Sequence, residues 1–380
     1  MLITPDPLPQ LRTRTSAKWR QYPADVLPLF VAESDFPLAE PIADALHDAI
    51  SRSDTGYAIA GPELPEAFAG FAARRFGWDV DPAQVRTTSD VSMGIVEALR
   101  RIIAPGDQVI ITPPVYPPFF DLIPEAGGRV LEVPLLKSDV GWALNLDGLE
   151  TAFAGGVRAF LLCNPHNPLG HPHPREQLEQ VAELAARYGV TVVSDEIHAP
   201  LAHSDGAYTP FLSVSDAARE HAIAITSASK GWNLAGLKCA IIVTASPRMD
   251  AVVAGMYEEV FWRTSILGVQ ASIAAFRHGE PWLDGVLETV EANRRLLTSL
   301  LAEHLPKTRY REPRASYLAW LDLRALGWGE DPSARILERA KVALNPGHTF
   351  GAQGAGHARL NFGCSPEVLT EAIERIAAIR

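Results

Sequence analysis

Hydrophobic residues in the middle of the chain occur either in short continuous runs or at helical intervals. The runs are rich in β-branched residues and predict buried strands. They are residues 85–88, 108–112, 129–133, 158–163, 191–194, 222–226 and 239–244. Between them, 91–103, 116–126 and 175–188 place apolar residues three or four apart, which predicts amphipathic helices. This alternation predicts an α/β fold with a mostly parallel sheet covered by helices on both faces.

The two ends of the chain follow other patterns. The first 37 residues are irregular and rich in proline, and we expect their apolar piece, 27–32, to lie against another part of the chain. Residues 249–304 predict almost continuous helix with a break at 279–281. The rest predicts a smaller α+β unit, with strands at 317–323, 342–344 and 358–360 and helices at 332–340 and 366–380. We therefore predict an N-terminal arm (1–45) that packs with a small domain (279–380), and a large domain (46–278) between them.

The composition limits the class of protein. The 380 residues are 47% hydrophobic, enough for a large core, and a net charge of −11 without a long basic run argues against a nucleic-acid partner. No apolar stretch reaches the roughly 20 residues of a membrane helix, and the first residues do not have the pattern of a secretion signal. Cys163, Cys239 and Cys364 lie far apart, which predicts buried thiols with no disulfide and no metal site. We therefore expect a cytoplasmic protein.

The segment Thr226-Ser227-Ala228-Ser229-Lys230-Gly231 directly follows an apolar run. A lysine amine at the end of a strand can form a Schiff base with an aldehyde, and hydroxyls beside it can bind a phosphate. Pyridoxal phosphate is the cofactor that requires both groups at once. Taken alone, the loop favours a solvated lysine, and only the rest of the chain changes this interpretation.

Two other polar segments follow predicted strands. Asn167 lies in the loop 164–170, and Asp195 comes directly after the run 191–194. Because ligands of open α/β sheets bind beyond the carboxyl ends of the strands, one pocket can collect Asn167, Asp195 and Lys230. Asp195 is suited to a protonated pyridine nitrogen, and the Asn167 amide to a phenolate oxygen. The alternatives are a helix N-cap for Asp195 and an Asn-Pro turn for Asn167.

Other residues near these segments are weaker candidates. Ser89, Asp90 and Val91 open a predicted helix, whose N–H groups can hold a phosphate. Tyr116 can present its ring to a planar cofactor, and the alternative is a core tyrosine. His198 can reach the same ring, and the alternative is a histidine on a polar helix face.

Two basic residues are candidates for binding anions. The guanidinium of Arg359 can bind a substrate carboxylate in two parallel bonds, unless it is a surface arginine. Lys238, eight residues beyond Lys230, can bind phosphate or be a charge on an edge strand. Neither a Walker loop nor a Gly-x-Gly-x-x-Gly motif is present, which argues against nucleotide binding.

Together these residues resemble the fold-type I pyridoxal-phosphate enzymes, the aspartate aminotransferase superfamily. Within it, the chain is similar nearly end to end to the MalY/PatB type of cystathionine β-lyase. The motifs that carry the resemblance are Val31 to Pro37, Gly56-Tyr57, Asn164 to Gly170, Ser194 to His198, Ser227 to Lys238, Ser316 to Asp322 and Arg359 to Cys364. The resemblance implies a seven-stranded sheet in the large domain and a homodimer with its active sites at the subunit interface.

The resemblance also implies a role for each candidate. Lys230 would hold the cofactor covalently and remove the Cα proton, Asp195 would bind the pyridinium nitrogen and Asn167 the ring oxygen. Arg359 would bind the substrate carboxylate. The remaining cofactor contacts would come from Tyr116, His198, Ser89, Asp90, Val91, Ser227, Ser229, Lys238 and, across the interface, Tyr57. Asp35 and Tyr317 would complete the substrate site.

Three departures from the family leave roles open. Ser89-Asp90 replaces a glycine that many relatives have in the first phosphate loop. Lys238 stands where aminotransferases have an arginine, and His198 where they have a tyrosine.

The activity that the resemblance implies is β-elimination from L-cystathionine or a related cysteine S-conjugate, giving a thiol, pyruvate and ammonia. An aminotransferase is the nearest alternative, because it begins with the same removal of the Cα proton. A non-catalytic regulatory protein on the same fold is a distant alternative. The sequence does not identify the sulfur substrate.

Overall fold

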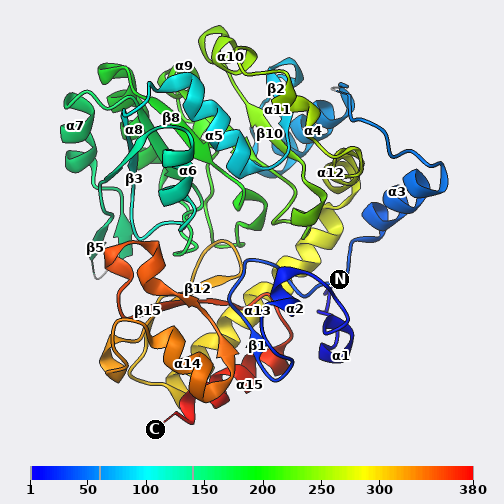
Figure 1. Cartoon of the computed structure of the whole chain (residues 1–380), viewed down its shortest axis with the longest axis vertical. Helices are drawn as coiled ribbons and strands as arrows, with labels where there is room; N and C mark the ends of the chain where they lie inside the picture. The colour runs from blue at the N-terminus through cyan, green and yellow to red at the C-terminus, as the bar shows by residue number, and fades with distance from the viewer. Residues whose placement is uncertain (1, 60, 139–140, 380) are drawn as a thin grey trace. The chain divides into compact units, whose positions relative to one another are not determined.

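The computed structural model describes residues 2–59, 61–138 and 141–379, and the chain divides into two compact units (Figure 1). The central unit consists of 38–166 and 172–280. The terminal unit combines the segment up to residue 37, the short segment 167–171 and the chain from 281 onward. The domain limits at 45/46 and 278/279 stay a prediction.

A seven-stranded sheet forms the core of the central unit, in the order β2-β10-β9-β8-β7-β3-β4. All neighbouring pairs are parallel except those made by β10, which runs antiparallel to both its neighbours. The strands are β2 (Val85–Thr88), β3 (Gln108–Ile111), β4 (Arg129–Glu132), β7 (Ala159–Cys163), β8 (Thr191–Asp195), β9 (Ala222–Thr226) and β10 (Ala240–Val243). The prediction of a mostly parallel seven-stranded sheet is therefore confirmed.

The central unit also contains helices and a small hairpin. The helices are α3 (Glu40–Ser51), α4 (Glu63–Phe76), α5 (Val91–Ile102), α6 (Phe119–Glu125), α7 (Leu146–Ala154), α8 (Arg175–Tyr188), α9 (Asp216–His221), α10 (Pro247–Ala254), α11 (Glu259–Trp262) and α12 (Ile266–His278). The hairpin pairs β5 (Leu136–Ser138) with β6 (Gly141–Ala143).

Both faces of the sheet are buried, which explains the continuous apolar runs. On one face, Ile111, Leu161 and Val193 belong to a core cluster with apolar residues of α5, α6 and α10. The opposite face is equally buried, as at Phe160 and Val192, and α8 contacts β8. A sheet covered in this way leaves the ends of its strands as the place where polar side chains can gather.

The terminal unit contains a four-stranded sheet in the order β11-β12-β15-β14 and a separate pair of strands, β1 and β13. Its strands are β1 (Leu27–Pro28), β11 (Arg309–Tyr310), β12 (Leu318–Asp322), β13 (Val342–Ala343), β14 (Asn345–Pro346) and β15 (His357–Asn361). Its helices are α1 (Leu8–Leu11), α2 (Ala17–Arg20), α13 (Glu280–His304, which begins in the central unit), α14 (Pro332–Ala340) and α15 (Pro366–Ala377). Leu27 pairs in parallel with Val342, so the prediction that the arm lies against another part of the chain is confirmed.

Several predicted element limits were wrong. The helix predicted at 116–126 begins only at Phe119, after Pro117 and Pro118, because proline offers no N–H for helix hydrogen bonds. The helical region 249–304 has further breaks between α10, α11 and α12. The last helix ends at Ala377, and Arg380 lies outside the described residues. In the described part of the chain, no helix has both the length and the apolarity needed to cross a membrane.

Candidate active site

The carboxyl ends of three neighbouring strands bring the predicted cofactor residues of the central unit together. Asp195, the last residue of β8, lies opposite Cys163 of β7 on one side and Ile225 of β9 on the other. The N–H of Asn164 donates to the Asp195 carbonyl (2.9 Å). The loop that carries Lys230 begins two residues after Ile225, at Ser227, so it leaves the sheet beside Asp195.

Asp195 is a buried carboxylate with few hydrogen-bond donors. Its Oδ1 accepts from the Ile197 N–H (3.1 Å), and no other hydrogen bond to this carboxylate is found among the described residues. Burial raises the pKa of Asp195 to about 6, although the Ile197 hydrogen bond and the positive charge of Lys230 both lower it. No α-helix begins here, because a 3₁₀ turn (Ala199–Leu201) follows, so the helix N-cap alternative is wrong.

The surroundings of Asp195 fit pyridoxal phosphate. A buried carboxylate with one backbone hydrogen bond gains most from a cationic N–H donor, and a protonated pyridine nitrogen is such a donor. Lys230 is close enough to Asp195 for its charge to act on that carboxylate. A carboxylate and an amine that share this edge of the sheet are the two groups that the ring nitrogen and the aldehyde of the cofactor require.

The loop that carries Lys230 is held by hydrogen bonds on both sides of the lysine. Ser227 Oγ donates to the Cys239 carbonyl (2.6 Å), and the Ser229 N–H donates to Ser227 Oγ (3.0 Å). The N–H of Trp232 donates to the Ala228 carbonyl (3.0 Å). Lys230 itself is half-buried, and these bonds hold the backbone on both sides of it.

Trp232 anchors this loop to the end of α12. Its indole is fully buried, and its Nε1–H donates to the Gly279 carbonyl (2.9 Å). A Cβ on Gly279 would meet both Trp232 Nε1 and the Ala275 carbonyl. The break predicted at 279–281 is therefore a place where only glycine lets the tryptophan approach the backbone.

The first turn of α5 is the predicted phosphate site. The Asp90 carboxylate caps this helix by accepting from the Met93 N–H (2.8 Å), and Lys238 Nζ lies 3.0 Å from its other oxygen. Thr88, the end of β2, pairs with Ala240 directly after Cys239, whose carbonyl binds Ser227. The start of α5 and the serines 227 and 229 thus lie at the same edge of the sheet, where helix N–H groups and hydroxyls suit a phosphate.

Tyr116 and His198, the two other predicted ring contacts, lie near this edge of the sheet. Tyr116 is half-buried, packs against the core cluster and meets the Phe119 ring edge-on at 5.8 Å. The Pro114 carbonyl lies 2.8 Å from His166 Nε2, which ties the segment before Tyr116 to the loop after β7. His198 is buried directly before the 3₁₀ turn. Their contacts with a cofactor stay predictions.

The terminal unit brings Arg359 and Asn167 together. Arg359 Nη1 donates to Asn167 Oδ1 (3.1 Å), and Nη2 donates to the Phe30 carbonyl (2.8 Å). The guanidinium lies over the Phe350 ring, 5.2 Å from its centroid, and Arg359 is 2% exposed. The alternative of a surface arginine is therefore wrong. A guanidinium presents its N–H groups in a planar fork that matches the geometry of a carboxylate.

Asp35 and Tyr317 are also buried in the terminal unit. Asp35 Oδ1 lies 2.6 Å from Lys18 Nζ in an ion pair whose side chains are 0% and 1% exposed. Burial raises the pKa of Asp35, while the charge of Lys18 lowers it. Tyr317 Oη donates to the Ala32 carbonyl (3.2 Å). The substrate contacts of Asp35 and Tyr317 stay predictions.

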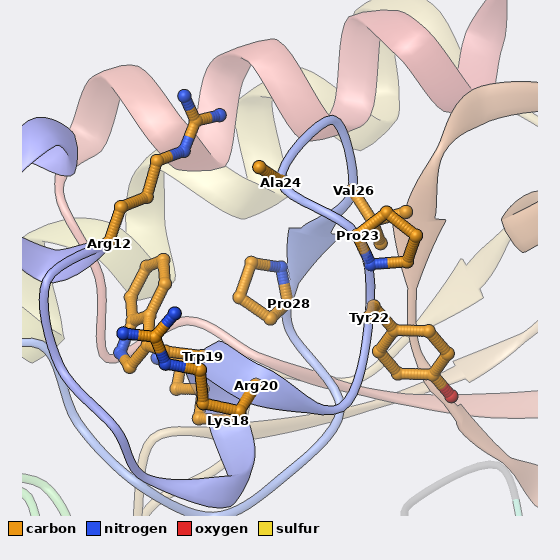
Figure 2. Close-up of a pocket in the computed structure, with 9 residues that line it drawn as sticks. All are labelled: Arg12, Lys18, Trp19, Arg20, Tyr22, Pro23, Ala24, Val26 and Pro28. Atoms are coloured by element: carbon orange, nitrogen blue, oxygen red, sulfur yellow. The ribbon is translucent and has the colours of Figure 1, made fainter.

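The N-terminal arm contains a small cavity of about 170 Å³, shown in Figure 2. All its lining residues come from one stretch of the arm: Arg12, Lys18, Trp19, Arg20, Tyr22, Pro23, Ala24, Val26 and Pro28. None of the predicted site residues lines it, although its lining residue Lys18 pairs with Asp35. The cavity is therefore not a candidate for the cofactor.

Tyr57 lies on an exposed apolar face of the central unit. It is 86% exposed and meets the Trp262 ring edge-on at 6.3 Å. Ile59 and Tyr257 are about as exposed, at 80% and 79%. The same face holds a cavity of about 730 Å³, lined by Ala58, Ile59, Gly61, Pro62, Pro65, Pro82, Ala83, Val85, Arg86, Thr87, Ala254, Glu258, Phe261 and Trp262.

Sequence reasoning missed two charged residues near the predicted site. Lys18 pairs with Asp35, and its only signal was a lysine inside the otherwise apolar Ala17-Lys18-Trp19. Glu196 follows Asp195 into the interior and is 1% exposed. Two adjacent acids directly after a strand buried at every residue were a signal that the second acid also has buried partners.

Known proteins resemble this chain over nearly its whole length. The family model for class I and II aminotransferases matches residues 24–376. A Mycobacterium leprae protein, provisionally named a cystathionine beta-lyase, is 46% identical over 389 residues, which cover 97% of this chain and 95% of that protein. Cystathionine beta-lyase PatB of Bacillus subtilis is 36% identical over 357 residues, or 93% of this chain and 92% of PatB.

Solved structures also resemble this chain over nearly its whole length. A Corynebacterium diphtheriae protein, provisionally named a PLP-dependent beta-cystathionase, superposes with a TM-score of 0.94 at 37% identity. The superposition covers 99% of this chain and 98% of that one. By its sequence and its fold, the chain belongs to the class I and II aminotransferase family.

Proposed function

We propose that this protein is a pyridoxal-phosphate-dependent carbon–sulfur β-lyase. It cleaves L-cystathionine or a related cysteine S-conjugate to a thiol, pyruvate and ammonia. The observation that carries the proposal is the buried Asp195, with a single backbone hydrogen bond, close to Lys230 at the carboxyl edge of the sheet. The similarity to proteins named cystathionine beta-lyase selects this reaction within the family.

The predicted site residues bind the cofactor and move the proton. Bound pyridoxal phosphate supplies an electron sink for the charge that develops at the substrate Cα. Asp195 holds the proton of the ring nitrogen, and Asn167 donates to the ring oxygen. Lys230 holds the cofactor until substrate binds, and its freed amine then takes the Cα proton. Tyr116 and His198 contact the ring, while Ser89, Asp90, Val91, Ser227, Ser229 and Lys238 surround the phosphate.

The overall reaction is balanced without an oxidant. The Cα–H electron pair becomes a Cα–Cβ double bond as the Cβ–S pair leaves with sulfur, which takes a proton to give the thiol. The remaining three-carbon enamine takes up water and releases ammonia, leaving pyruvate. Arg359, whose guanidinium is buried beside Asn167, binds the substrate carboxylate in two parallel bonds, and Asp35 and Tyr317 complete the substrate site.

The protein acts as a homodimer in which Tyr57 reaches the partner's active site. The exposed face around Tyr57, Ile59, Tyr257 and Trp262 supports this proposal, because such a group of large apolar side chains is typical of a protein interface. We further propose a cytoplasmic location and no nucleic-acid partner. The three cysteines, which are free and buried, are consistent with a reducing compartment.

The test begins with the visible absorbance of the purified protein after incubation with pyridoxal phosphate. L-cystathionine is then added, and pyruvate and free thiol are assayed; we expect the two products in equal amounts. Lys230→Ala should abolish turnover, while Lys137→Ala, which removes a lysine from the exposed strand β5, should not. If instead an amino acid alone converts the cofactor to its amine form without pyruvate, the protein is an aminotransferase.

A further inference from the structure

Glu196 is a second buried acid directly beside Asp195, and its carboxylate has a complete set of donors. Oε1 accepts from Ser194 Oγ (2.9 Å) and from the Phe211 N–H (2.8 Å). Oε2 accepts from Tyr208 Oη (2.6 Å). A buried carboxylate with donors on both oxygens is oriented rigidly, in contrast to Asp195 with its single hydrogen bond.

The backbone of Glu196 ties β8 to β9. Its N–H donates to the Ile225 carbonyl (2.8 Å), and its carbonyl accepts from Thr226 Oγ1 (3.1 Å). Thr226 directly precedes Ser227, the first residue of the loop that carries Lys230. Glu196 therefore connects the turn that holds Asp195, the start of the lysine loop and the segment 208–211.

Burial, nearby charges and hydrogen bonds shift the pKa values of both Glu196 and Tyr208. The pKa of Glu196 is raised to about 7, mainly by burial and slightly by the charge of Asp195, although the hydrogen bonds from Tyr208, Phe211 and Ser194 lower it. Burial and the nearby carboxylate both raise the pKa of Tyr208 well above its usual value, so Tyr208 stays a neutral donor.

We propose that Glu196 is a positioning residue. By binding Ser194, Tyr208 and the Phe211 N–H, it fixes the turn 195–197 so that the Asp195 carboxylate faces the ring nitrogen of the cofactor. The inference rests on the proposed function, because the ring nitrogen belongs to pyridoxal phosphate. The physical reason is that one backbone hydrogen bond holds Asp195 only weakly, so its direction depends on the turn to which it belongs.

Tyr208→Phe tests this role, because it removes one donor from Glu196 and leaves Oε2 bare in a buried site. Tyr188→Phe is a matched control, since Tyr188 Oη donates to Glu150 (3.1 Å) in an exposed pair of the same type. The assay measures the dissociation constant of pyridoxal phosphate from the apoprotein. A second series uses the analogue in which carbon replaces the ring nitrogen, and the thermal midpoint of each apoprotein reports folding.

We expect Tyr208→Phe to bind pyridoxal phosphate about tenfold more weakly, the size of one lost charge-assisted hydrogen bond. Its affinity for the carbon analogue should match that of the unmodified protein, because this analogue makes no bond to Asp195. Glu196→Gln keeps the shape and the Oε1 contacts, and its amide can donate to Tyr208 Oη, so it should bind the cofactor nearly normally. Tyr188→Phe should change neither constant.

Three outcomes would overturn the inference. Equal weakening of pyridoxal phosphate and the carbon analogue in Tyr208→Phe would indicate a general structural effect. If Glu196→Gln binds pyridoxal phosphate as weakly as Tyr208→Phe does, the negative charge of Glu196, and not its positioning of the turn, supports cofactor binding. Unchanged affinity of Tyr208→Phe for pyridoxal phosphate would exclude the positioning role proposed for Glu196. If the unmodified protein binds no pyridoxal phosphate, the proposed function itself fails, and this result is distinguishable from the other three.

Discussion

The buried ion pair between Lys18 and Asp35 gives a quantitative prediction for the stability of the terminal unit. Lys18→Met keeps a side chain of similar length but removes the charge. Asp35 then stays buried at 1% exposure without its partner at 2.6 Å. Breaking a buried pair from one side costs about 3–5 kcal/mol, because the remaining charge is uncompensated. We expect a loss of this size in the free energy of unfolding.

Two further variants separate the ion pair from simple packing. The double variant Lys18→Met with Asp35→Asn removes both charges and should recover most of the loss, since a buried pair contributes little net stability compared with neutral groups. Arg52→Met is the control, because Arg52 and Asp48 form an exposed pair at 59% and 77% exposure. That substitution should cost less than about 1 kcal/mol.

The assay is urea unfolding of the apoprotein, followed by tryptophan fluorescence. Trp19 is a local reporter, because its ring centroid lies 5.5 Å from Lys18 Nζ. The reasoning is refuted if Lys18→Met loses no more stability than Arg52→Met. It is also refuted if the double variant is no more stable than Lys18→Met.

The dependence of this loss on pH has a definite sign. Burial raises the pKa of Asp35 in the folded protein above its unfolded value, so the group binds its proton more tightly when folded. Its contribution to stability is fully present below the unfolded pKa and is lost as the pH rises through the folded pKa. In Lys18→Met the lowering effect of Lys18 is gone, so the destabilisation should be greatest near neutral pH and shrink in acid.

Other predictions concern the site and the interface. Arg359→Lys should raise KM for cystathionine about tenfold or more with a smaller change in kcat, because lysine cannot make two parallel bonds to a carboxylate; equal losses in both constants would contradict this role. Gly279→Ala should lower the thermal midpoint and weaken cofactor binding, because its Cβ meets Trp232 Nε1, and normal binding would contradict the anchoring of the lysine loop. Tyr57→Ala should weaken binding of the cofactor phosphate, while sedimentation still detects a dimer. Full activity of this variant would exclude a contact of Tyr57 with the cofactor in the partner's active site. Cofactor affinity of the apoprotein should fall as the pH drops below about 6, where Asp195 becomes protonated and cannot hold a cationic ring nitrogen, and this fall should be absent in Asp195→Asn.

The sheet could be predicted from the sequence because its signal is local and strong. The strands β7, β8 and β9 are buried at every residue, so each appears as a short run of mainly apolar and β-branched residues between helices. The same signal located Asp195 and Lys230, since both lie where a run ends. Element limits were less certain where turn residues decide them, as at Pro117 and Pro118 before α6.

Contacts between side chains far apart in the sequence could not be predicted in the same way. Arg359 and Asn167 are separated by 192 positions, and neither residue type specifies the other. The partners of Glu196 include Tyr208 and a backbone N–H at Phe211, both in an irregular segment without periodicity. Such pairs arise from the path of the chain, which a single sequence does not encode as a pattern.

The pairing of β1 with β13 has a consequence for the order in which the protein is made. Leu27 leaves the ribosome early, but its partner Val342 is synthesised 315 residues later. At roughly 5–20 residues per second, the arm waits about 15–60 s for this strand. Because domains generally fold as units, we expect the central unit to fold in that interval while the arm still exposes an apolar edge that a chaperone can bind. A ribosome stalled before residue 342 should therefore display a nascent chain with a protease-resistant middle and a cleavable N-terminus.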